Sequence, residues 1–223
     1  MQNPLVSIVI PALNEEANVA KAIIGVREAL NGISHEIIVI DGNSSDKTAS
    51  IAKRHGARVL YDGMGKGHSL IYGMSKAKGK IIVSMDADLS NQPKELLLLI
   101  DGIRIGYDIC MGSRFITGGS TEDMPMLRIA GNKIFVLLVN LFFGSSYSDL
   151  CYGYRSFSRH ALSRLDLREN GFGIEAEISV KAAKKRLKVM EIPSNEKRRS
   201  AGDGKLHTFR DGLSILLTIL RNA

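Results

Sequence analysis

The sequence has no tryptophan and few residues that would cross-link a small fold. Its 223 residues include two cysteines, Cys110 and Cys151, and five prolines. Two cysteines cannot form a disulfide framework, so we expect a reducing, cytoplasmic environment. A chain of this length buries roughly 70–75% of its unfolded surface and needs no such framework. The content of 44% hydrophobic and 24% charged residues excludes a disordered or collagen-like chain.

Long apolar runs are also missing. The most apolar window is 134–143, with nine apolar residues in ten, which is about half of the ~20 residues that a membrane-spanning helix needs. Residues 1–4 lead directly into a short apolar strand, without the basic and then apolar stretch of a secretory signal. We therefore expect neither a spanning segment nor a secretory leader.

Positive charge is concentrated near the C-terminus. Between Lys181 and Arg210 there are 10 basic and 3 acidic residues, which accounts for the whole net charge of +7. Such a patch indicates an anionic partner: nucleic acid, a phosphorylated ligand or a membrane surface. The alternative is a solvated helix face followed by a loop. The patch lacks the interleaved aromatic residues of proteins that bind single strands, so we expect no nucleic-acid partner.

Short β-branched runs alternate with amphipathic stretches through the first half of the chain, which predicts an α/β fold with βαβ units, a mostly parallel sheet and helices on both faces. We expect strands at 5–10, 36–40, 57–60, 80–85 and 108–111, and helices at 15–30, 45–55, 67–78 and 93–104. The second half predicts helices at 126–143 and 174–186 and strands at 152–157 and 187–192. We expect one domain over residues 1–207, followed by an amphipathic helix at 208–223.

Two carboxylates directly follow the apolar strand that ends at Met85: Asp86 and Asp88, separated by Ala87. Ligands of parallel sheets bind beyond the carboxyl ends of the strands. Unpaired, the two carboxylates would repel each other, and a divalent cation removes that repulsion. Hard oxygen ligands with few protein contacts suit Mg²⁺ or Mn²⁺ bridging a diphosphate. The alternative is a helix cap before Pro93.

Two further loops follow strands. Asp41 begins the loop 41–48, in which a serine can cap the next helix while Asp41 hydrogen-bonds a nucleotide base or ribose. In the loop 63–67, three glycines let the backbone approach a ligand closely, and Lys66 adds a positive charge. This loop is neither a phosphate-binding P-loop nor a dinucleotide fingerprint. Its pattern argues against a P-loop NTPase and a nicotinamide enzyme.

Seven motifs in order carry a resemblance to a known family; they lie at 11–16, 41–48, 86–90, 112–115, 149–155, 171–177 and 199–206. Together they resemble family 2 glycosyltransferases of the GT-A (Rossmann-like) fold. Within that family, the likeness is greatest to polyprenol-phosphate sugar transferases, the dolichol-phosphate mannosyltransferase type. Gly42 stands where the family has the second residue of an Asp-Asp pair, and Leu13 stands where an aromatic residue is frequent, so the base preference is left open.

The resemblance, with the loops above, implies a site for each part of a sugar transfer. Metal ligands are expected at Asp86, Asp88 and Ser90, with Ser90 acting through water. The nucleotide sugar is expected at Pro11, Leu13, Asn14, Glu15, Asp41, Lys66, Asp86, Ala87, Asp88 and Arg199. Arg114 and Arg128 match residues that hold an acceptor lipid phosphate. Arg199 matches a residue that faces the donor diphosphate, and Asp149 is expected to line the catalytic site with Asp88 and these arginines.

The implied reaction is the inverting, metal-dependent transfer of a hexose from a nucleotide diphosphate sugar, of the GDP-mannose or UDP-glucose type, to a polyprenyl or dolichyl monophosphate. An anionic phosphate needs no strong general base. The first alternative is a GT-A transferase acting on a glycan or soluble hydroxyl, which would need a base from among Asp149, Glu175 and Glu177. The second alternative is a non-catalytic nucleotide-binding protein.

A lipid-linked acceptor requires contact with a membrane, here as a peripheral protein on the inner, cytoplasmic face. The apolar stretch 134–143 and the basic run 181–205 suit such a surface, as does the terminal helix, where Phe209, Leu213, Leu216 and Leu220 form one stripe. The alternative is that both apolar helices pack against the domain core or against a second subunit, which would make a homodimer.

Overall fold

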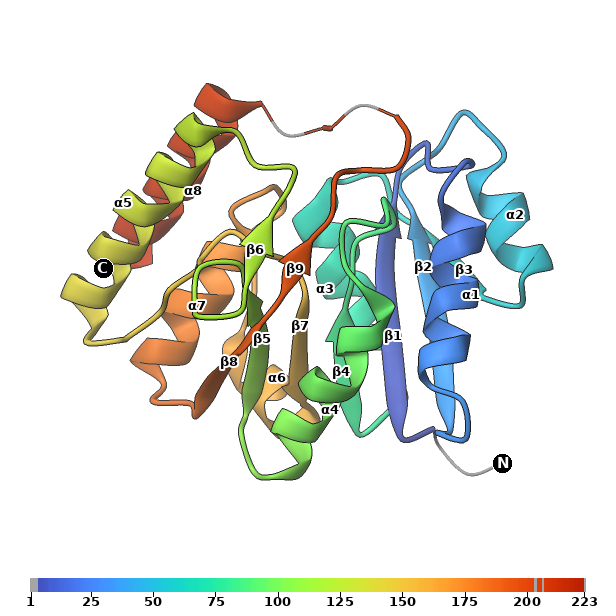
Figure 1. Cartoon of the computed structure of the whole chain (residues 1–223), viewed down its shortest axis with the longest axis horizontal. Helices are drawn as coiled ribbons and strands as arrows, with labels where there is room; N and C mark the ends of the chain where they lie inside the picture. The colour runs from blue at the N-terminus through green and yellow to red at the C-terminus, as the bar shows by residue number, and fades with distance from the viewer. Residues whose placement is uncertain (1–3, 203, 206, 223) are drawn as a thin grey trace.

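A seven-stranded sheet runs through the molecule (Figure 1). The computed structural model describes residues 4–202, 204–205 and 207–222. In sheet order the strands are β3 (Arg58–Tyr61), β2 (His35–Asp41), β1 (Val6–Ala12), β4 (Ile81–Ser84), β7 (Arg155–Ser158), β5 (Ile109–Ser113) and β8 (Val189–Pro193). Every neighbouring pair is parallel except those of β7, which runs antiparallel to β4 and β5. The predicted mostly parallel α/β sheet is confirmed.

Helices cover both faces because successive side chains of a strand point to opposite sides of the sheet. Ile8 and Ile10 of β1 share a core cluster with helices α1 (Val19–Ala29), α2 (Thr48–Arg54) and α4 (Leu96–Arg104). On the opposite face, Val9 shares a cluster with α3 (Lys66–Lys76), α6 (Arg159–Leu165) and α7 (Ile174–Lys184). This arrangement leaves the carboxyl ends of the parallel strands open at one edge of the sheet.

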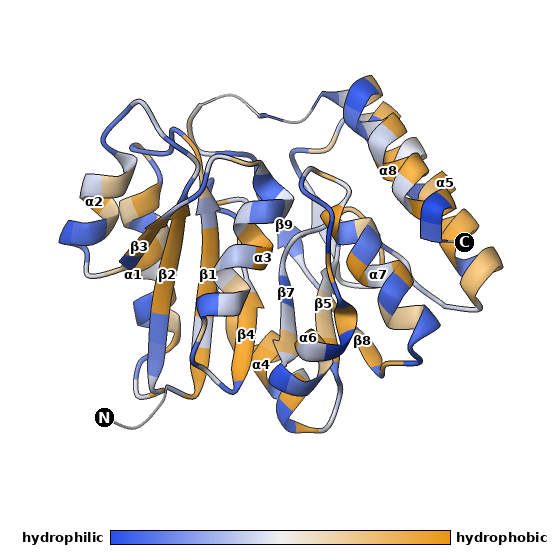
Figure 2. Cartoon of the chain, turned by 180° about the vertical axis from the view of Figure 1, so that it is seen from behind, coloured by the Kyte–Doolittle hydropathy of each residue, from blue (hydrophilic) through white to orange (hydrophobic). Residues whose placement is uncertain are grey.

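A third cluster joins α7 to two apolar helices at one end of the molecule, α5 (Met126–Phe143) and α8 (Thr208–Asn222). Val139 of α5, Val180 of α7 and Ile219 of α8 are buried in it. Figure 2 shows that α5 and α8 lie side by side and that both carry much apolar surface. Of the stripe predicted on the terminal helix, Phe209, Leu213 and Leu220 are exposed and Leu216 is half-buried; Leu217 beside it is also exposed.

The expectation that no segment could span a membrane needs a correction. Helix α5 has 18 residues and, by length and composition alone, is apolar enough to cross a membrane. Only 11% of this window is buried, so the domain core does not cover it. Its inner side belongs to the fold, since Asn132 Oδ1 accepts the N–H groups of Leu150 and Cys151 at 3.1 and 3.0 Å. The helix itself has the bounds expected for it, 126–143, but its apolar length is greater than the window 134–143 indicates.

Several element boundaries differ from those expected. Helix α1 begins at Val19 rather than at residue 15, because Glu15 accepts backbone hydrogen bonds that close a separate turn at 15–18. Helix α6 was missed: it has seven residues and depends on a cap, in which Ser158 accepts the Ala161 N–H. The two-residue strands β6 (Ser120–Thr121) and β9 (Asn195–Glu196) form a second sheet that was also not predicted. The expected helix 93–104 starts with the 3-10 turn η1 (Pro93–Glu95).

Candidate active site

A cavity of about 400 Å³ lies beyond the carboxyl ends of β1 and β4, where the sheet topology predicts a ligand. Most of the predicted site residues line it: Pro11, Leu13, Glu15, Lys66, Asp86, Ala87, Asp88, Ser90, Arg114, Arg128 and Arg199. The structure therefore brings together residues from the N-terminal strand, the central strands, α5 and the segment after β9. Asn14, Asp41 and Asp149 are the three predicted residues outside this lining.

Asn14 connects two loops instead of facing the cavity. Its backbone is left-handed, with φ of 53°. The Asn14 N–H donates to Ser44 Oγ at 2.9 Å, and its Oδ1 accepts the Ser45 N–H at 2.8 Å. Asn14 thus fixes the loop after β2 against the loop after β1.

Asp41, at the end of β2, is 2% exposed and retains an acceptor without a partner. Its Oδ2 accepts the Ser44 N–H at 3.0 Å. Its buried Oδ1 accepts no hydrogen bond from the residues that the structure describes. Ile40 and Gly42 on either side line the cavity. A buried carboxylate oxygen costs free energy unless it is hydrogen-bonded, so this position suits a donor group on a ligand.

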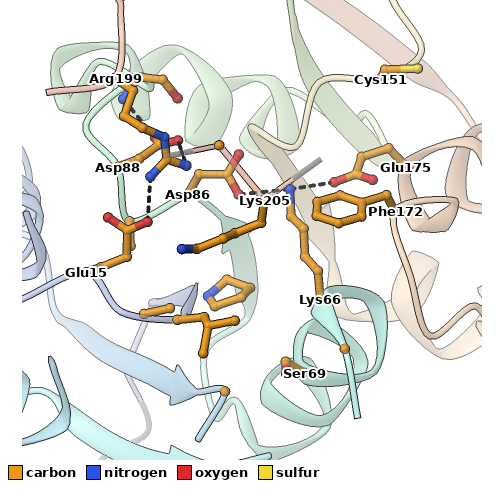
Figure 3. A pocket seen from close by; sticks show the side chains of 18 of the residues that line it. Glu15, Lys66, Ser69, Asp86, Asp88, Cys151, Phe172, Glu175, Arg199 and Lys205 are labelled. Atoms are coloured by element: carbon orange, nitrogen blue, oxygen red, sulfur yellow. Dashed lines mark hydrogen bonds and ion pairs between the residues drawn. The ribbon is translucent and has the colours of Figure 1, made fainter. Parts of the chain in front are cut away.

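Lys66 lies between two carboxylates (Figure 3). Its Nζ is 3.0 Å from Asp86 Oδ1 and 3.1 Å from Glu175 Oε1. Burial alone would lower the pKa of Lys66, but the two carboxylates raise it above its usual value, so the ammonium stays charged. Gly153 leaves the room for this cluster, because a Cβ there would lie 3.1 Å from Glu175 Oε1 and 3.5 Å from the Lys66 Nζ.

Arg199 lies between Asp88, one of the predicted metal ligands, and Glu15 in the loop after β1. Its Nη2 is 2.8 Å from Asp88 Oδ2 and its Nη1 is 2.6 Å from Glu15 Oε1. Burial would lower the pKa of Arg199, and the carboxylates of Asp88 and Glu15 raise it. The second oxygen of Asp88 accepts the Ser90 N–H at 3.0 Å.

The donor set at the end of β4 fits a magnesium or manganese ion that keeps several waters. Asp86 and Asp88 present carboxylates at the cavity surface, with 27% and 14% of their side chains exposed. Within residues 4–202, 204–205 and 207–222 there is no group of three or more His, Cys, Asp or Glu that could hold a metal. Mg²⁺ is commonly bound by one or two carboxylates together with substrate phosphates. Two carboxylates are therefore sufficient where a diphosphate completes the coordination.

Arg114 is the centre of a buried ionic cluster. Its Nε and Nη2 donate to the two oxygens of Asp149 at 2.7 and 2.9 Å, and its Nη1 donates to Glu196 Oε1 at 2.9 Å. Burial would lower the pKa of Arg114, and Asp149 and Glu196 together raise it. Burial raises the pKa of Glu196, and Arg114 opposes that rise. Asp149 thus lies beside Arg114, outside the lining, where it orients the guanidinium.

Arg128 connects the cavity to the two apolar helices. It lies in the first turn of α5, and its Nε donates to Thr208 Oγ1, the first residue of α8, at 3.1 Å. Met124 and Ile215 also line the cavity. Arg128 therefore lies where the cavity lining meets α5 and α8.

Gly63 and Gly65 of the loop 63–67 line the cavity, and two glycines of this loop also have a structural role that was not expected. A Cβ on Gly67 would lie 2.2 Å from the Glu169 carbonyl oxygen, and one on Gly65, whose φ is 115°, would lie 2.6 Å from that of Asn170. The Gly67 N–H donates to the Asn170 carbonyl at 2.9 Å. The close approach is therefore to the backbone of residues 169–171. Lys66, between the two glycines, is positioned by this contact.

Sequence reasoning missed several lining residues: Asp62, Asp123, Cys151, Phe172, Glu196 and Lys205. The sequence could have indicated Glu196, because it is one of only three acidic residues in the basic stretch from Lys181 to Arg210. Phe172 lies within the motif 171–177, and the Lys66 Nζ is 5.8 Å from its ring centroid. In the motif 199–206, Asp203 and Leu206 lie outside the described residues.

Comparison with known proteins identifies the class to which this fold and site belong. The model of glycosyl transferase family 2 matches residues 7–166, more than half of the chain. The chain belongs to this family and is a glycosyltransferase. This membership favours a transferase over the alternative of a non-catalytic nucleotide-binding protein.

Three individual proteins show which members of the family the chain resembles. The chain is 35% identical over 227 residues to the low-salt glycan biosynthesis hexosyltransferase Agl6 of Haloferax volcanii, covering 99% of this chain and 54% of the relative. It is 32% identical to the dolichol-phosphate mannosyltransferase of Pyrococcus furiosus, covering 90% and 59%. It thus spans little more than half the length of these two relatives. A dolichyl-phosphate hexose transferase of Haloferax volcanii is 29% identical, covering 96% of this chain and 92% of the relative.

Solved structures support the fold. Glucosyl-3-phosphoglycerate synthase from Mycobacterium tuberculosis, in complex with Mn²⁺, UDP and glucosyl-3-phosphoglycerate, superposes with a TM-score of 0.76. The match covers 98% of this chain and 80% of the synthase at 22% identity. The GT-A fold expected from the motifs is therefore confirmed, and neighbours with this fold have been solved with a divalent metal.

Proposed function

We propose that this glycosyltransferase moves a hexose from a nucleotide diphosphate sugar to a polyprenyl or dolichyl monophosphate at the inner, cytoplasmic face of a membrane. The observation that carries the proposal is one cavity that combines a carboxylate pair, three arginines and a boundary formed by exposed apolar helices. Relatives named as dolichyl-phosphate transferases support the same acceptor class.

The donor diphosphate belongs beside Asp86 and Asp88. A divalent ion held by these two residues would offset the charge that develops on the leaving diphosphate. Arg199, at the same edge of the cavity, supplies a guanidinium suited to two phosphate oxygens at once. Asp41, with its buried acceptor, supports a nucleoside position at the end of β2. In-line attack from the opposite side of the sugar would invert the anomeric centre.

The three candidate general bases are all engaged by other groups of the protein, which favours a phosphate acceptor over a hydroxyl acceptor. Asp149 is held by two hydrogen bonds from the Arg114 guanidinium and a third from the Arg114 backbone N–H. Glu177 accepts backbone N–H groups at residues 168 and 169 and does not line the cavity. Glu175 lines the cavity but pairs with Lys66. An acceptor that arrives ionised needs no base, whereas a hydroxyl would need one of these carboxylates to leave its partner.

The acceptor phosphate belongs on the side of Arg114 and Arg128. Both arginines line the cavity, and the lining continues to Met124 and Ile215 beside α5 and α8. A polyprenyl chain leaving this side would pass directly onto apolar surface. The phosphate and the lipid tail thus have adjacent sites of suitable chemistry.

The exposed sides of α5 and α8 suit the headgroup region of a bilayer. Their most exposed apolar side chains include Leu137 and Leu141 on α5 and Phe209 and Leu213 on α8, each more than half exposed. Exposed cations, among them Lys133 and Arg210, lie on the same two helices. Apolar residues flanked by cations favour anionic lipid surfaces. Since one side of α5 packs in the domain, we infer that the helix lies along the membrane rather than across it.

The test is transfer of radiolabel. Purified protein with Mn²⁺ or Mg²⁺ is incubated with polyprenyl monophosphate and a panel of radiolabelled UDP and GDP sugars, and the lipid is extracted. We expect label in the organic phase with one donor, and none with Asp88→Asn. If no donor labels the lipid while a glycan or soluble hydroxyl is labelled, the acceptor assignment is wrong.

A further inference from the structure

Arg199 is held at Asp88 by the backbone around both residues. The Lys197 N–H donates to the Ser90 carbonyl at 2.9 Å, and the Ser200 N–H donates to the Asp88 carbonyl at 3.3 Å. On the other side, Asn18 Nδ2 donates to the Ala201 carbonyl at 3.1 Å. The segment that carries Arg199 is therefore docked against the loop that carries the predicted metal ligands.

In this docked arrangement both side-chain oxygens of Asp88 accept hydrogen bonds. Its Oδ1 accepts the Ser90 N–H and its Oδ2 accepts the Arg199 guanidinium (Figure 3). Arg199 is mostly covered, with 18% of its side chain exposed, and it also pairs with Glu15. The guanidinium is therefore the counterion of Asp88 in this structure.

A divalent cation and a guanidinium cannot share one carboxylate oxygen at low cost, because like charges a few ångströms apart repel strongly where water is scarce. For a cation to bind Asp88 Oδ2, Arg199 has to move away from it. Once displaced, the guanidinium needs another anion, since a partly buried cation without a counterion is costly. A nucleoside diphosphate bound at the same cation supplies that anion.

We propose that Arg199 is an internal competitor of the divalent cation: it holds Asp88 in the donor-free protein and exchanges that carboxylate for the diphosphate when cation and nucleotide bind together. The proposal rests on the proposed function, in that it takes Asp88 as a metal ligand. It makes cation binding and nucleotide binding mutually dependent, so that each strengthens the other by the same factor. The donor-free protein would then bind the cation weakly.

The test measures Mn²⁺ affinity without any reaction. Free Mn²⁺ is followed by electron paramagnetic resonance during titration of the full chain, alone and with UDP or GDP. Arg199→Ala is compared with the wild type and with Lys205→Ala, a matched control that removes one charge from the cavity lining. No ion pair of Lys205 with a carboxylate is seen within the described part of the chain. Arg199→Lys provides a variant that keeps the charge but loses the planar fork.

Without nucleotide, Arg199→Ala should bind Mn²⁺ roughly tenfold more tightly than the wild type, as expected for removing a charge-assisted hydrogen bond. Lys205→Ala should change the affinity by no more than about threefold, and Arg199→Lys should fall between. With UDP or GDP, the factor by which the nucleotide strengthens Mn²⁺ binding should be smaller in Arg199→Ala than in the wild type. Asp88→Asn should weaken Mn²⁺ binding in both backgrounds.

Two failures are distinguishable. If Arg199→Ala binds Mn²⁺ no more tightly than the wild type, or no more tightly than Lys205→Ala, the competition does not occur and the inference is overturned. If the wild type binds no Mn²⁺ even with saturating UDP or GDP, the metal-dependent function itself fails. Thermal unfolding of each variant shows whether a changed affinity reflects a changed fold.

Discussion

Arg114 and Asp149 form a buried, two-point ion pair, with Nε–Oδ2 and Nη2–Oδ1 distances of 2.7 and 2.9 Å. The side chains are 4% and 0% exposed. Asp149 is in turn positioned by Glu191, which accepts the N–H groups of Ser148 and Asp149 at 3.0 and 3.2 Å. The Arg114 guanidinium, where we propose that the acceptor phosphate binds, thus has a fixed orientation.

Replacing Asp149 should therefore affect both stability and catalysis. We expect Asp149→Asn to lower the free energy of unfolding by about 3 kcal/mol, because it leaves a buried cation with one carboxylate fewer. The kcat/KM for the acceptor should fall by roughly 10²-fold as the guanidinium loses its orientation. Urea unfolding and initial rates at varied acceptor concentration measure the two effects. Unchanged stability would show that the pair contributes nothing.

Replacing Glu196 should improve acceptor binding, whereas replacing Asp149 should impair it. It occupies Nη1 of Arg114, where an incoming phosphate would compete with it. Glu196→Gln removes that negative charge, so we expect the KM for polyprenyl phosphate to fall by roughly threefold or more with little change in the KM for the donor. Glu122→Gln, an exposed acid that pairs with Lys197, is the matched control. A rise in the acceptor KM would contradict the assigned position of the phosphate.

Membrane binding should depend on the outer side of α8. We expect Leu213→Glu with Leu217→Glu to reduce sedimentation with vesicles containing anionic lipid by roughly tenfold or more, because two apolar side chains no longer enter the interface. Leu98→Glu is the control, since Leu98 is 50% exposed on α4, away from this surface. An equal loss for the control, or none for the double variant, would favour the alternative of a dimer contact, which sedimentation equilibrium then tests.

The cysteine thiols give a pH-dependent prediction. Burial raises the pKa of Cys110 and of Cys151 to about 12 from an ordinary value of 9.0. The folded protein should therefore react with iodoacetamide at pH 8 roughly a thousandfold more slowly than the urea-unfolded chain, and the rate should increase with pH. Since the unfolded thiols ionise first, the stability that these groups contribute is present below pH 9 and is lost as the pH rises toward 12. Equal rates in the two states would contradict the burial.

The sequence predicted the position of the site better than its internal contacts. The strand before Asp86 and the loop after β1 are local patterns, and the rule for parallel sheets then places them at one edge. The partner of Arg114 in β9 is 82 residues away, and no periodicity signals such a pairing. The strand expected at 152–157 is present as β7, but its antiparallel direction was not predicted, since its neighbours in the sheet are set by tertiary packing. The contact of the glycines at 65 and 67 with the backbone at 169–171 was not predicted, because the two segments are distant in sequence.

We propose above that Asp86 and Asp88 hold a cation that binds the donor diphosphate. The most direct measurement is anomalous diffraction from a crystal containing Mn²⁺ and a UDP or GDP sugar. We predict a manganese peak at coordination distance from Asp88 and from the diphosphate oxygens, with the Arg199 guanidinium moved from Asp88 to the diphosphate. A nucleotide bound with its diphosphate away from Asp86 and Asp88, and no manganese between them, would contradict the account.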